Sequence, residues 1–236
     1  MAPDNNDYNN WHSSHSVDDD TNAPWHLYVK KKLAGIFLDK STILEIGCGR
    51  GGFSNYLANA FPNLERIYAS DFSTEALRIA REKYISHSQL ITWQQEDIMA
   101  LSYDDKSFNV VISCETIEHV PNPKKAIGEL YRVLKPGGIL LLTCPNYFNL
   151  FGIWCLYRWL IGKPFTEGGQ PYVNYLHMPV IYFFLKNVGF EILQWQASEI
   201  IIPARVPKHF WNKKIPSALS IFGYRTYYTL KKNAAI

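Results

Sequence analysis

The chain has 236 residues, of which 47% are apolar and 15% aromatic, so it can bury one large core in a single α/β domain with an insertion. Its 24 lysines and arginines nearly balance its 21 aspartates and glutamates, and the net charge of +3 gives no nucleic-acid-binding footprint. The late positive charges are interpreted as a solvated face, with contact to an anionic substrate or membrane surface as the alternative: Lys208, Lys213, Lys214, Arg225, Lys231 and Lys232.

Residues 1–24 are rich in Asn, Asp, Ser and His and show no helical or strand periodicity. They predict a mobile tail ahead of one domain over residues 25–236. The alternative is that Trp11, His12 and His15 fold over a ligand. The domain is expected to open with a helix from Trp25 to about residue 38, because apolar residues recur there at helical spacing.

Beyond residue 38, apolar runs alternate with amphipathic segments. Predicted strands cover residues 43–46, 66–70, 89–93, 108–113 and 139–144, and two further strands lie near 190–197 and 221–230. Predicted helices cover about 53–61, 73–85 and 124–134, the last of them ended by KPGG at 135–138. This alternation indicates a mostly parallel sheet covered by helices on both faces. An aromatic-rich insert at 145–188 interrupts the rhythm.

The cysteines and the N-terminus bear on location. The N-terminus is polar and acidic, unlike a signal peptide, and the longest apolar stretch (about 139–161) is interrupted by polar residues, unlike a membrane span. We therefore expect a cytoplasmic protein, monomeric or homodimeric, with peripheral membrane contact left open. No C-x-x-C pair exists, which fits structural thiols in a reducing compartment: Cys48, Cys114, Cys144 and Cys155.

The loop after the first predicted strand, EIGCGRGG (45–52), is the strongest local signal. Ligands of parallel sheets lie beyond the carboxyl ends of the strands, and glycines let the backbone approach them. Gly47, Gly49 and Gly52 satisfy the dinucleotide pattern G-x-G-x-x-G, whereas Gly47, Gly49 and Gly51 satisfy G-x-G-x-G. Asp71, at the end of the second strand, would accept hydrogen bonds from ribose hydroxyls under either interpretation.

Four ordered motifs together carry a family resemblance. ILEIGCGRGGFSNYLA (43–58), ASDFS (69–73), QQEDIMALSYDDKSFNVVISCETIEHVPNP (94–123) and LYRVLKPGGILLLTCPN (130–146) resemble class I methyltransferases, above all those of ubiquinone and menaquinone biosynthesis. The resemblance covers about residues 40–146, with a weaker echo at 177–192. It implies a Rossmann-like sheet of seven strands, the last antiparallel, S-adenosylmethionine as methyl donor and S-adenosylhomocysteine as product.

The same resemblance implies the residues that hold the cofactor. Glu45 and the Gly47–Gly51 turn, with Cys48 and Gly49, would surround its methionine part. Asp71 and Phe72 would adjoin the ribose, Asp97 and Ile98 the adenine, and Cys114 the sulfonium. Glu45 also separates the two interpretations of the glycine loop, because an acid there attracts an ammonium or sulfonium and repels a pyrophosphate.

The segment CETIEHV (114–120) is the candidate reacting region. Glu118 and His119, with His177 from later in the chain, are candidates for shaping the pocket or for acid–base chemistry. The alternative is a divalent cation such as Mg²⁺ held by Glu115, Glu118 and His119, as the E-x-x-E-H pattern of some ubiquinone-pathway and small-RNA methyltransferases suggests by resemblance. A purely structural role is the third interpretation.

The aromatic insert at 145–188 predicts either an acceptor pocket with a lid or a small helical subdomain. The expected reaction is methyl transfer to an oxygen, less favourably a nitrogen, of a small apolar or aromatic acceptor. An RNA 2′-O-methyltransferase and an NAD-dependent oxidoreductase are the alternatives. A non-catalytic partner subunit is disfavoured by the complete donor motifs.

Overall fold

The computed structural model describes residues 3–15, 21–87, 89–199 and 217–233. Its centre is a seven-stranded sheet in the order β3-β2-β1-β4-β5-β7-β6. The strands are β1 (Thr42–Ile46), β2 (Arg66–Asp71), β3 (Ile91–Gln95), β4 (Phe108–Cys114), β5 (Leu134–Pro145), β6 (Phe190–Ser198) and β7 (Arg225–Lys232). Strands β1 to β5 pair in parallel, and β7 runs antiparallel to both β5 and β6. The predicted fold class is confirmed.

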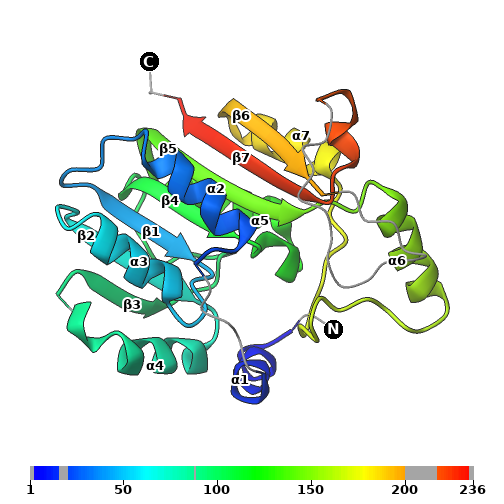
Figure 1. Ribbon diagram of the computed structural model, residues 1–236, viewed down its shortest axis with the longest axis horizontal. Coiled ribbons are helices and arrows are strands. Elements are labelled where there is room, and N and C mark those ends of the chain that lie inside the picture. The colour runs from blue at the N-terminus through cyan, green and yellow to red at the C-terminus, as the bar shows by residue number, and fades with distance from the viewer. Residues whose placement is uncertain (1–2, 16–20, 88, 200–216, 234–236) are drawn as a thin grey trace.

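Helices cover both faces of the sheet (Figure 1). On one face lie α2 (Pro24–Leu33), α3 (Gly52–Ala60) and α4 (Thr74–Lys83), and on the other lie α5 (Pro123–Val133) and α7 (Met178–Val188). Short 3-10 helices η1 (Ile85–His87), η2 (Ile117–His119) and η3 (Ser217–Phe222) join the elements. All four sequence-predicted helices exist here within a few residues of their expected bounds, although the first ends five residues early.

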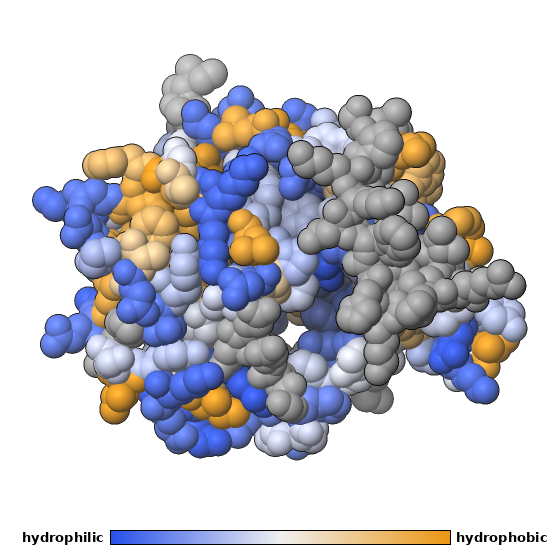
Figure 2. Space-filling model, in the orientation of Figure 1, coloured by the Kyte–Doolittle hydropathy of each residue, from blue (hydrophilic) through white to orange (hydrophobic). Residues whose placement is uncertain are grey.

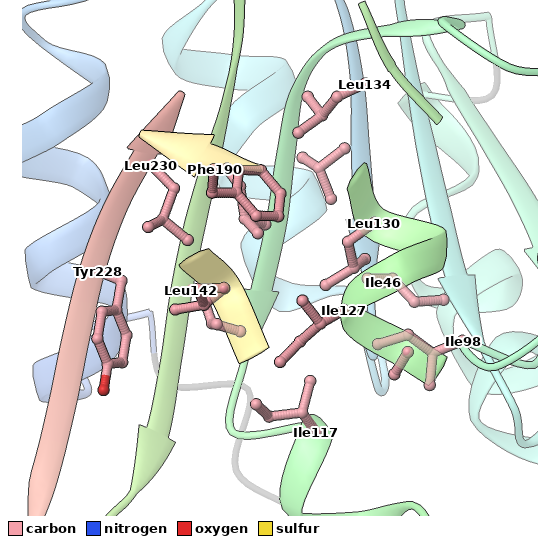
Figure 3. Close-up of a cluster of buried hydrophobic side chains, with 14 of the residues drawn as sticks. Ile46, Ile98, Ile117, Ile127, Leu130, Leu134, Leu142, Phe190, Tyr228 and Leu230 are labelled. Carbon is pink, nitrogen blue, oxygen red and sulfur yellow. The ribbon is translucent and has the colours of Figure 1, made fainter. Parts of the chain in front are cut away.

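Strand β5 shows why the centre of the sheet is so apolar. Leu140, Leu142 and Cys144 face the α5/α7 core, whereas Leu141 faces the α2/α3/α4 core, and all four are fully buried. Side chains alternate across a strand, so a strand covered on both faces needs apolar residues at every position. Figure 3 shows how side chains from β1, β5, α5 and β7 meet in the first of these cores.

Two features differ from the sequence predictions. The strand β5 begins at Leu134 rather than near 139, because KPGG forms an irregularity in the pairing with β4 instead of a separate turn. The N-terminal segment, which lacks periodicity, contains a ten-residue helix, α1 (Asn5–Ser14), with a capping box between Asp4 and Asp7. Within the described ranges, no helix combines the length and apolarity needed to cross a membrane. The late lysines Lys208, Lys213 and Lys214 fall outside those ranges.

The insert forms α6 (Leu150–Leu160), which projects from one end of the molecule (Figure 1). Asn149 caps its N-terminus by accepting a hydrogen bond from the Gly152 amide. Its inner side joins a small third core made by Tyr147, Phe151, Cys155 and Tyr224. The aromatics of the insert therefore build a small helical subdomain, which contacts Tyr224 immediately before β7.

Candidate active site

A cavity lies at the carboxyl ends of β1, β2 and β4, between these strand ends and α1. The order of the strands reverses between β1 and β4, so the loops that follow these two strands diverge. Open parallel sheets bind ligands in the crevice at such a point. Eight of the residues predicted from the sequence line this cavity: Gly47, Gly49, Asp71, Phe72, Asp97, Ile98, Glu115 and His119. Tyr8, Trp11 and His12 of α1 line it as well.

The glycine turn is built for close approach. Gly47, Gly49 and Gly51 all have positive φ angles, 79°, 53° and 79°, which favour glycine. A Cβ at Gly51 would lie 2.4 Å from the Trp93 ring, so this glycine serves packing between α3 and β3. A Cβ at Gly49 would meet no atom within 4 Å, because this residue borders the cavity. The turn thus leaves backbone exposed where a ligand can reach it.

Asp71 organises the floor of the cavity. Its carboxylate accepts hydrogen bonds from the Gly49 amide (2.8 Å) and the Ser73 amide (2.9 Å), and so ties the glycine turn to the loop after β2. Each oxygen keeps a further lone pair for a ligand hydroxyl. Asp97 is held similarly, accepting a hydrogen bond from the Met99 amide (2.8 Å).

Other predicted cofactor residues lie behind the cavity wall rather than in it. Glu45 is 5% exposed, and its carboxylate accepts a hydrogen bond from Ser54 on α3. Burial raises the pKa of Glu45 to about 8, with the Ser54 hydrogen bond opposing that rise. Cys48 and Cys114 do not line the cavity either, and burial raises the pKa of both thiols well above the usual range.

Helix α1 closes the cavity from outside, and sequence reasoning found no helix here. Its Tyr8 hydroxyl donates to the His119 carbonyl (2.8 Å). Its Asn9 side-chain oxygen accepts hydrogen bonds from Ser73 (2.8 Å) and from the Glu75 amide (3.1 Å) at the start of α4. Arg50, in the glycine turn, donates to the His12 carbonyl (2.5 Å). The alternative in which the N-terminal segment folds over the site matches this arrangement.

The two glutamates of E-x-x-E-H have opposite environments. Glu115 forms an ion pair with Arg225 on β7 (3.0 Å) and accepts a hydrogen bond from Thr143 (2.8 Å). Glu118 is fully buried, and neither carboxylate oxygen has a hydrogen-bond partner. Burial, followed by the negative charges of Glu115 and Glu167, raises the pKa of Glu118 well above its ordinary range. A buried carboxyl held this way is typical of functional sites.

The imidazole of His119 has a defined orientation. Its Nδ1 lies 2.8 Å from the Tyr172 carbonyl, which can only accept, so in the neutral ring Nε2 is the nitrogen with the lone pair. This Nε2 lies 3.8 Å from a Glu118 oxygen and 3.9 Å from a Glu167 oxygen. Glu167 comes from the insert, where Tyr147 (2.5 Å) and Tyr224 (2.7 Å) both donate to its other oxygen.

The ligand atoms of Glu118, His119 and Glu167 all lie within 4.8 Å of one another. The structure thus groups His119 and Glu118 as the sequence suggests, but Glu167 takes the place assigned to Glu115. His177 is exposed at the start of α7 and contacts the Phe148 ring, outside this group. No motif in the sequence marks Glu167, because only the folding of the insert brings it to η2.

Residues 44–142 match the family model described as a methyltransferase domain. This segment is the class I methyltransferase domain that the sequence motifs predict. Over 124 residues it is 34% identical to the ubiquinone biosynthesis O-methyltransferase of Haemophilus ducreyi, covering 50% of this chain and 50% of that protein. Over 158 residues it is 28% identical to phosphoethanolamine N-methyltransferase 2 of Caenorhabditis elegans, covering 66% of this chain and 32% of that protein. The chain thus spans between about a third and half of these relatives.

Solved structures agree on the fold of this methyltransferase domain. A methyltransferase in complex with the Trm112 activator of Haloferax volcanii matches 99% of this chain and 99% of that chain, with a TM-score of 0.67 and 17% identity. Phosphoethanolamine N-methyltransferase 2 of Haemonchus contortus, in complex with S-adenosyl-L-methionine, has a TM-score of 0.66 and 19% identity, covering 95% of this chain and 56% of that one. The predicted family is confirmed, and the oxidoreductase alternative has no support from these relatives.

Proposed function

We propose that this protein transfers a methyl group from S-adenosylmethionine to an oxygen of a small, fairly apolar acceptor. The observation that carries the proposal is that the glycine turn, Asp71, Asp97 and His119 line one cavity. Relatives include both O- and N-methyltransferases, so the choice of oxygen rests on the reacting group rather than on the likeness.

The residues present fit the cofactor. Gly49 leaves space that a Cβ would fill, and Asp71 has lone pairs free for ribose hydroxyls. Asp97 and Ile98 border the same cavity and suit an adenine amino group and ring face. Bound here, S-adenosylmethionine supplies a methyl carbon already activated by its sulfonium. The protein then has to align the acceptor, exclude water and remove a proton.

His119 is the candidate base. Its Nε2 carries the lone pair and His119 borders the cavity, so it can take the proton of an acceptor hydroxyl. The neighbouring Glu167 carboxylate would stabilise the resulting imidazolium. Tyr8 and the rest of α1 cover the cavity and keep water from the reacting atoms.

A divalent cation at Glu118, His119 and Glu167 is the second candidate role for this group. The observation that favours it is the buried, unpartnered carboxylate of Glu118 beside the lone pair of Nε2. The Nδ1 contact with the Tyr172 carbonyl is the kind of support that metal-binding histidines usually have. A cation such as Mg²⁺ or Zn²⁺ would polarise the acceptor oxygen.

Calorimetric titration tests the donor. S-adenosylmethionine and S-adenosylhomocysteine are expected to bind and NAD⁺ is not. Asp71→Ala and Asp97→Ala should each weaken binding by at least about threefold, because each loses a carboxylate acceptor. Binding of NAD⁺ alone, or unchanged affinity in both variants, would contradict the proposal.

Chelation distinguishes the role of His119 as a base from its role as a cation ligand. With phenolic acceptors as probes, His119→Ala should lower turnover by about 10²–10⁴-fold while affinity for S-adenosylmethionine stays the same. Treatment with EDTA should leave turnover unchanged if His119 acts as a base. If EDTA abolishes turnover and Mg²⁺ or Zn²⁺ restores it, the group binds a cation instead. The Glu167→Gln variant should then show no such restoration.

A further inference from the structure

Helix α1 is held in place by polar contacts rather than by an apolar face. It contains no aliphatic residue, and its residues range from blue to nearly white in Figure 2, at the lower edge of the molecule where Figure 1 places α1. Asn5 donates to the Phe72 carbonyl, and Asn9 accepts from Ser73. His12 lies on the same face, three residues beyond Asn9, and is only 6% exposed. A polar side chain buried on this face is expected to have a partner as well.

The imidazole of His12 borders the cavity of the donor site. Its Nδ1 is sealed from solvent, and within the part of the chain that the structure describes no group pairs with it. Nε2 is therefore the ring nitrogen that a ligand in the cavity can reach. A buried polar ring beside a cavity, without a protein partner at Nδ1, indicates that a ligand supplies part of its environment.

The protonation of this ring follows from its burial. Burial lowers the pKa of His12, an effect that the Asp71 charge opposes and the Arg50 charge reinforces. The ring is therefore neutral near pH 7 and has a single N–H group. A proton on Nδ1 would be a buried donor without an acceptor, and such orphaned donors are rare. His12 thus presents Nε2 as an N–H donor.

The neighbours of His12 indicate which part of the donor it meets. Among the charged groups that act on His12, Asp71 has the largest effect, and both residues line the same cavity. Arg50 of the glycine turn donates to the His12 carbonyl and so holds this end of α1 beside the turn. Asp71 can accept the proton of a ribose hydroxyl, and the oxygen of that hydroxyl can then accept a hydrogen bond itself. An N–H donor near Asp71 suits that oxygen.

We propose that His12 binds the ribose of S-adenosylmethionine, with its Nε2–H donating to the oxygen of a hydroxyl whose proton Asp71 accepts. The inference rests on the methyl donor of the proposed function. It adds to the donor site a residue from a helix that precedes the sheet, whereas the other donor-site residues follow the strands. The affinity for the donor then depends on a ribose hydroxyl through His12 as well as through Asp71.

Calorimetric titration with hydroxyl-deleted ligands tests this contact without any methyl transfer. The probes are S-adenosylhomocysteine and its 2′-deoxy and 3′-deoxy forms. His12→Phe should weaken binding of S-adenosylhomocysteine by about 3–10-fold, the effect of one lost hydrogen bond. One of the two deoxy ligands should bind wild type and His12→Phe equally, because it lacks the hydroxyl that His12 contacts. His12→Gln, whose side-chain amide can donate, should recover part of the lost affinity.

Two control variants separate a ribose contact from a general effect on α1. His15→Phe changes an exposed residue of the same segment and keeps a ring to stack on Trp11, so it should bind all three ligands like wild type. Asn9→Ala removes hydrogen bonds that hold α1 to the start of α4, so it should weaken all three ligands by the same factor. A loss that depends on one hydroxyl is therefore specific to contact with the ribose.

Three outcomes would overturn the proposal. Equal loss in His12→Phe for all three ligands would show that His12 does not contact the ribose. A loss that disappears only with 5′-methylthioadenosine, which lacks the amino-acid part, would assign His12 to the carboxylate of the donor instead. Wild type that binds none of the ligands would refute the donor of the proposed function together with this contact, whereas the first two outcomes leave that donor in place.

Discussion

Glu118→Gln is expected to make the protein more stable, by an amount that depends on pH. Glu118 is fully buried, and both carboxylate oxygens lack a hydrogen-bond partner. A buried polar group without a partner costs about 1–3 kcal/mol, and more if it is charged. Glutamine keeps the cost of an unpartnered neutral group, but it cannot ionise, so it avoids the added cost of the buried charge. For a chain of this size, each kcal/mol shifts the melting temperature by about 2–4 °C, so avoiding about 1 kcal/mol of charge cost should raise it by roughly 2–4 °C.

The pH dependence adds a second, independent signature. The pKa of Glu118 is raised in the folded state by burial, so folding takes up a proton above the ordinary pKa of a glutamate. Stability therefore falls as the pH rises from that ordinary value towards the folded-state pKa. The glutamine variant does not titrate, so its advantage over wild type should grow with pH.

Thermal unfolding monitored by circular dichroism, in EDTA and over a pH series, measures both effects. Glu115→Gln is the matched control, because Glu115 has an ion pair with Arg225 and a hydrogen bond from Thr143. Loss of the ion pair in Glu115→Gln should destabilise the protein by about 3 kcal/mol, an effect opposite in sign to that of Glu118→Gln. Equal or lower melting of Glu118→Gln across the pH series would refute the argument that its carboxylate is uncompensated.

Three further variants probe the donor side of the site. Asn9→Ala should speed S-adenosylmethionine dissociation several-fold in stopped flow, because α1 loses the Asn9 hydrogen bonds to the start of α4. Asn10→Ala is the control: Asn10 is exposed, and its loss should not change the dissociation rate. Gly51→Ala should lower the free energy of unfolding in urea by more than about 1 kcal/mol, since φ is 79° and Trp93 leaves no space. Glu45→Gln should melt above wild type at alkaline pH but not near pH 5, because the folded-state pKa of Glu45 is about 8; equal pH profiles would contradict this.

The sheet and the donor side could be predicted because their signals are local in the sequence. Apolar runs such as residues 43–46 mark strands buried on both faces, and the glycine turn follows its strand directly. Asp71 and Asp97 each follow the end of a predicted strand, so the topology alone brings them to one edge. The family resemblance then supplied their expected roles. Those roles remain predictions until titration of the variants.

The acceptor side could not be predicted because it depends on contacts between distant segments. Helix α1 has little amphipathic pattern, since it is held by side-chain hydrogen bonds such as those of Asn9 rather than by an apolar face. Glu167 reaches His119 only because two tyrosines, Tyr147 and Tyr224, hold it from separate parts of the chain. Glu115 and Glu118 were both candidate cation ligands in the sequence, yet Arg225 on the antiparallel strand β7 pairs with Glu115, whereas the Glu118 carboxyl has no hydrogen-bond partner. A motif fixes which residue types are near one another, whereas long-range packing decides which of them keeps a carboxyl group without a partner.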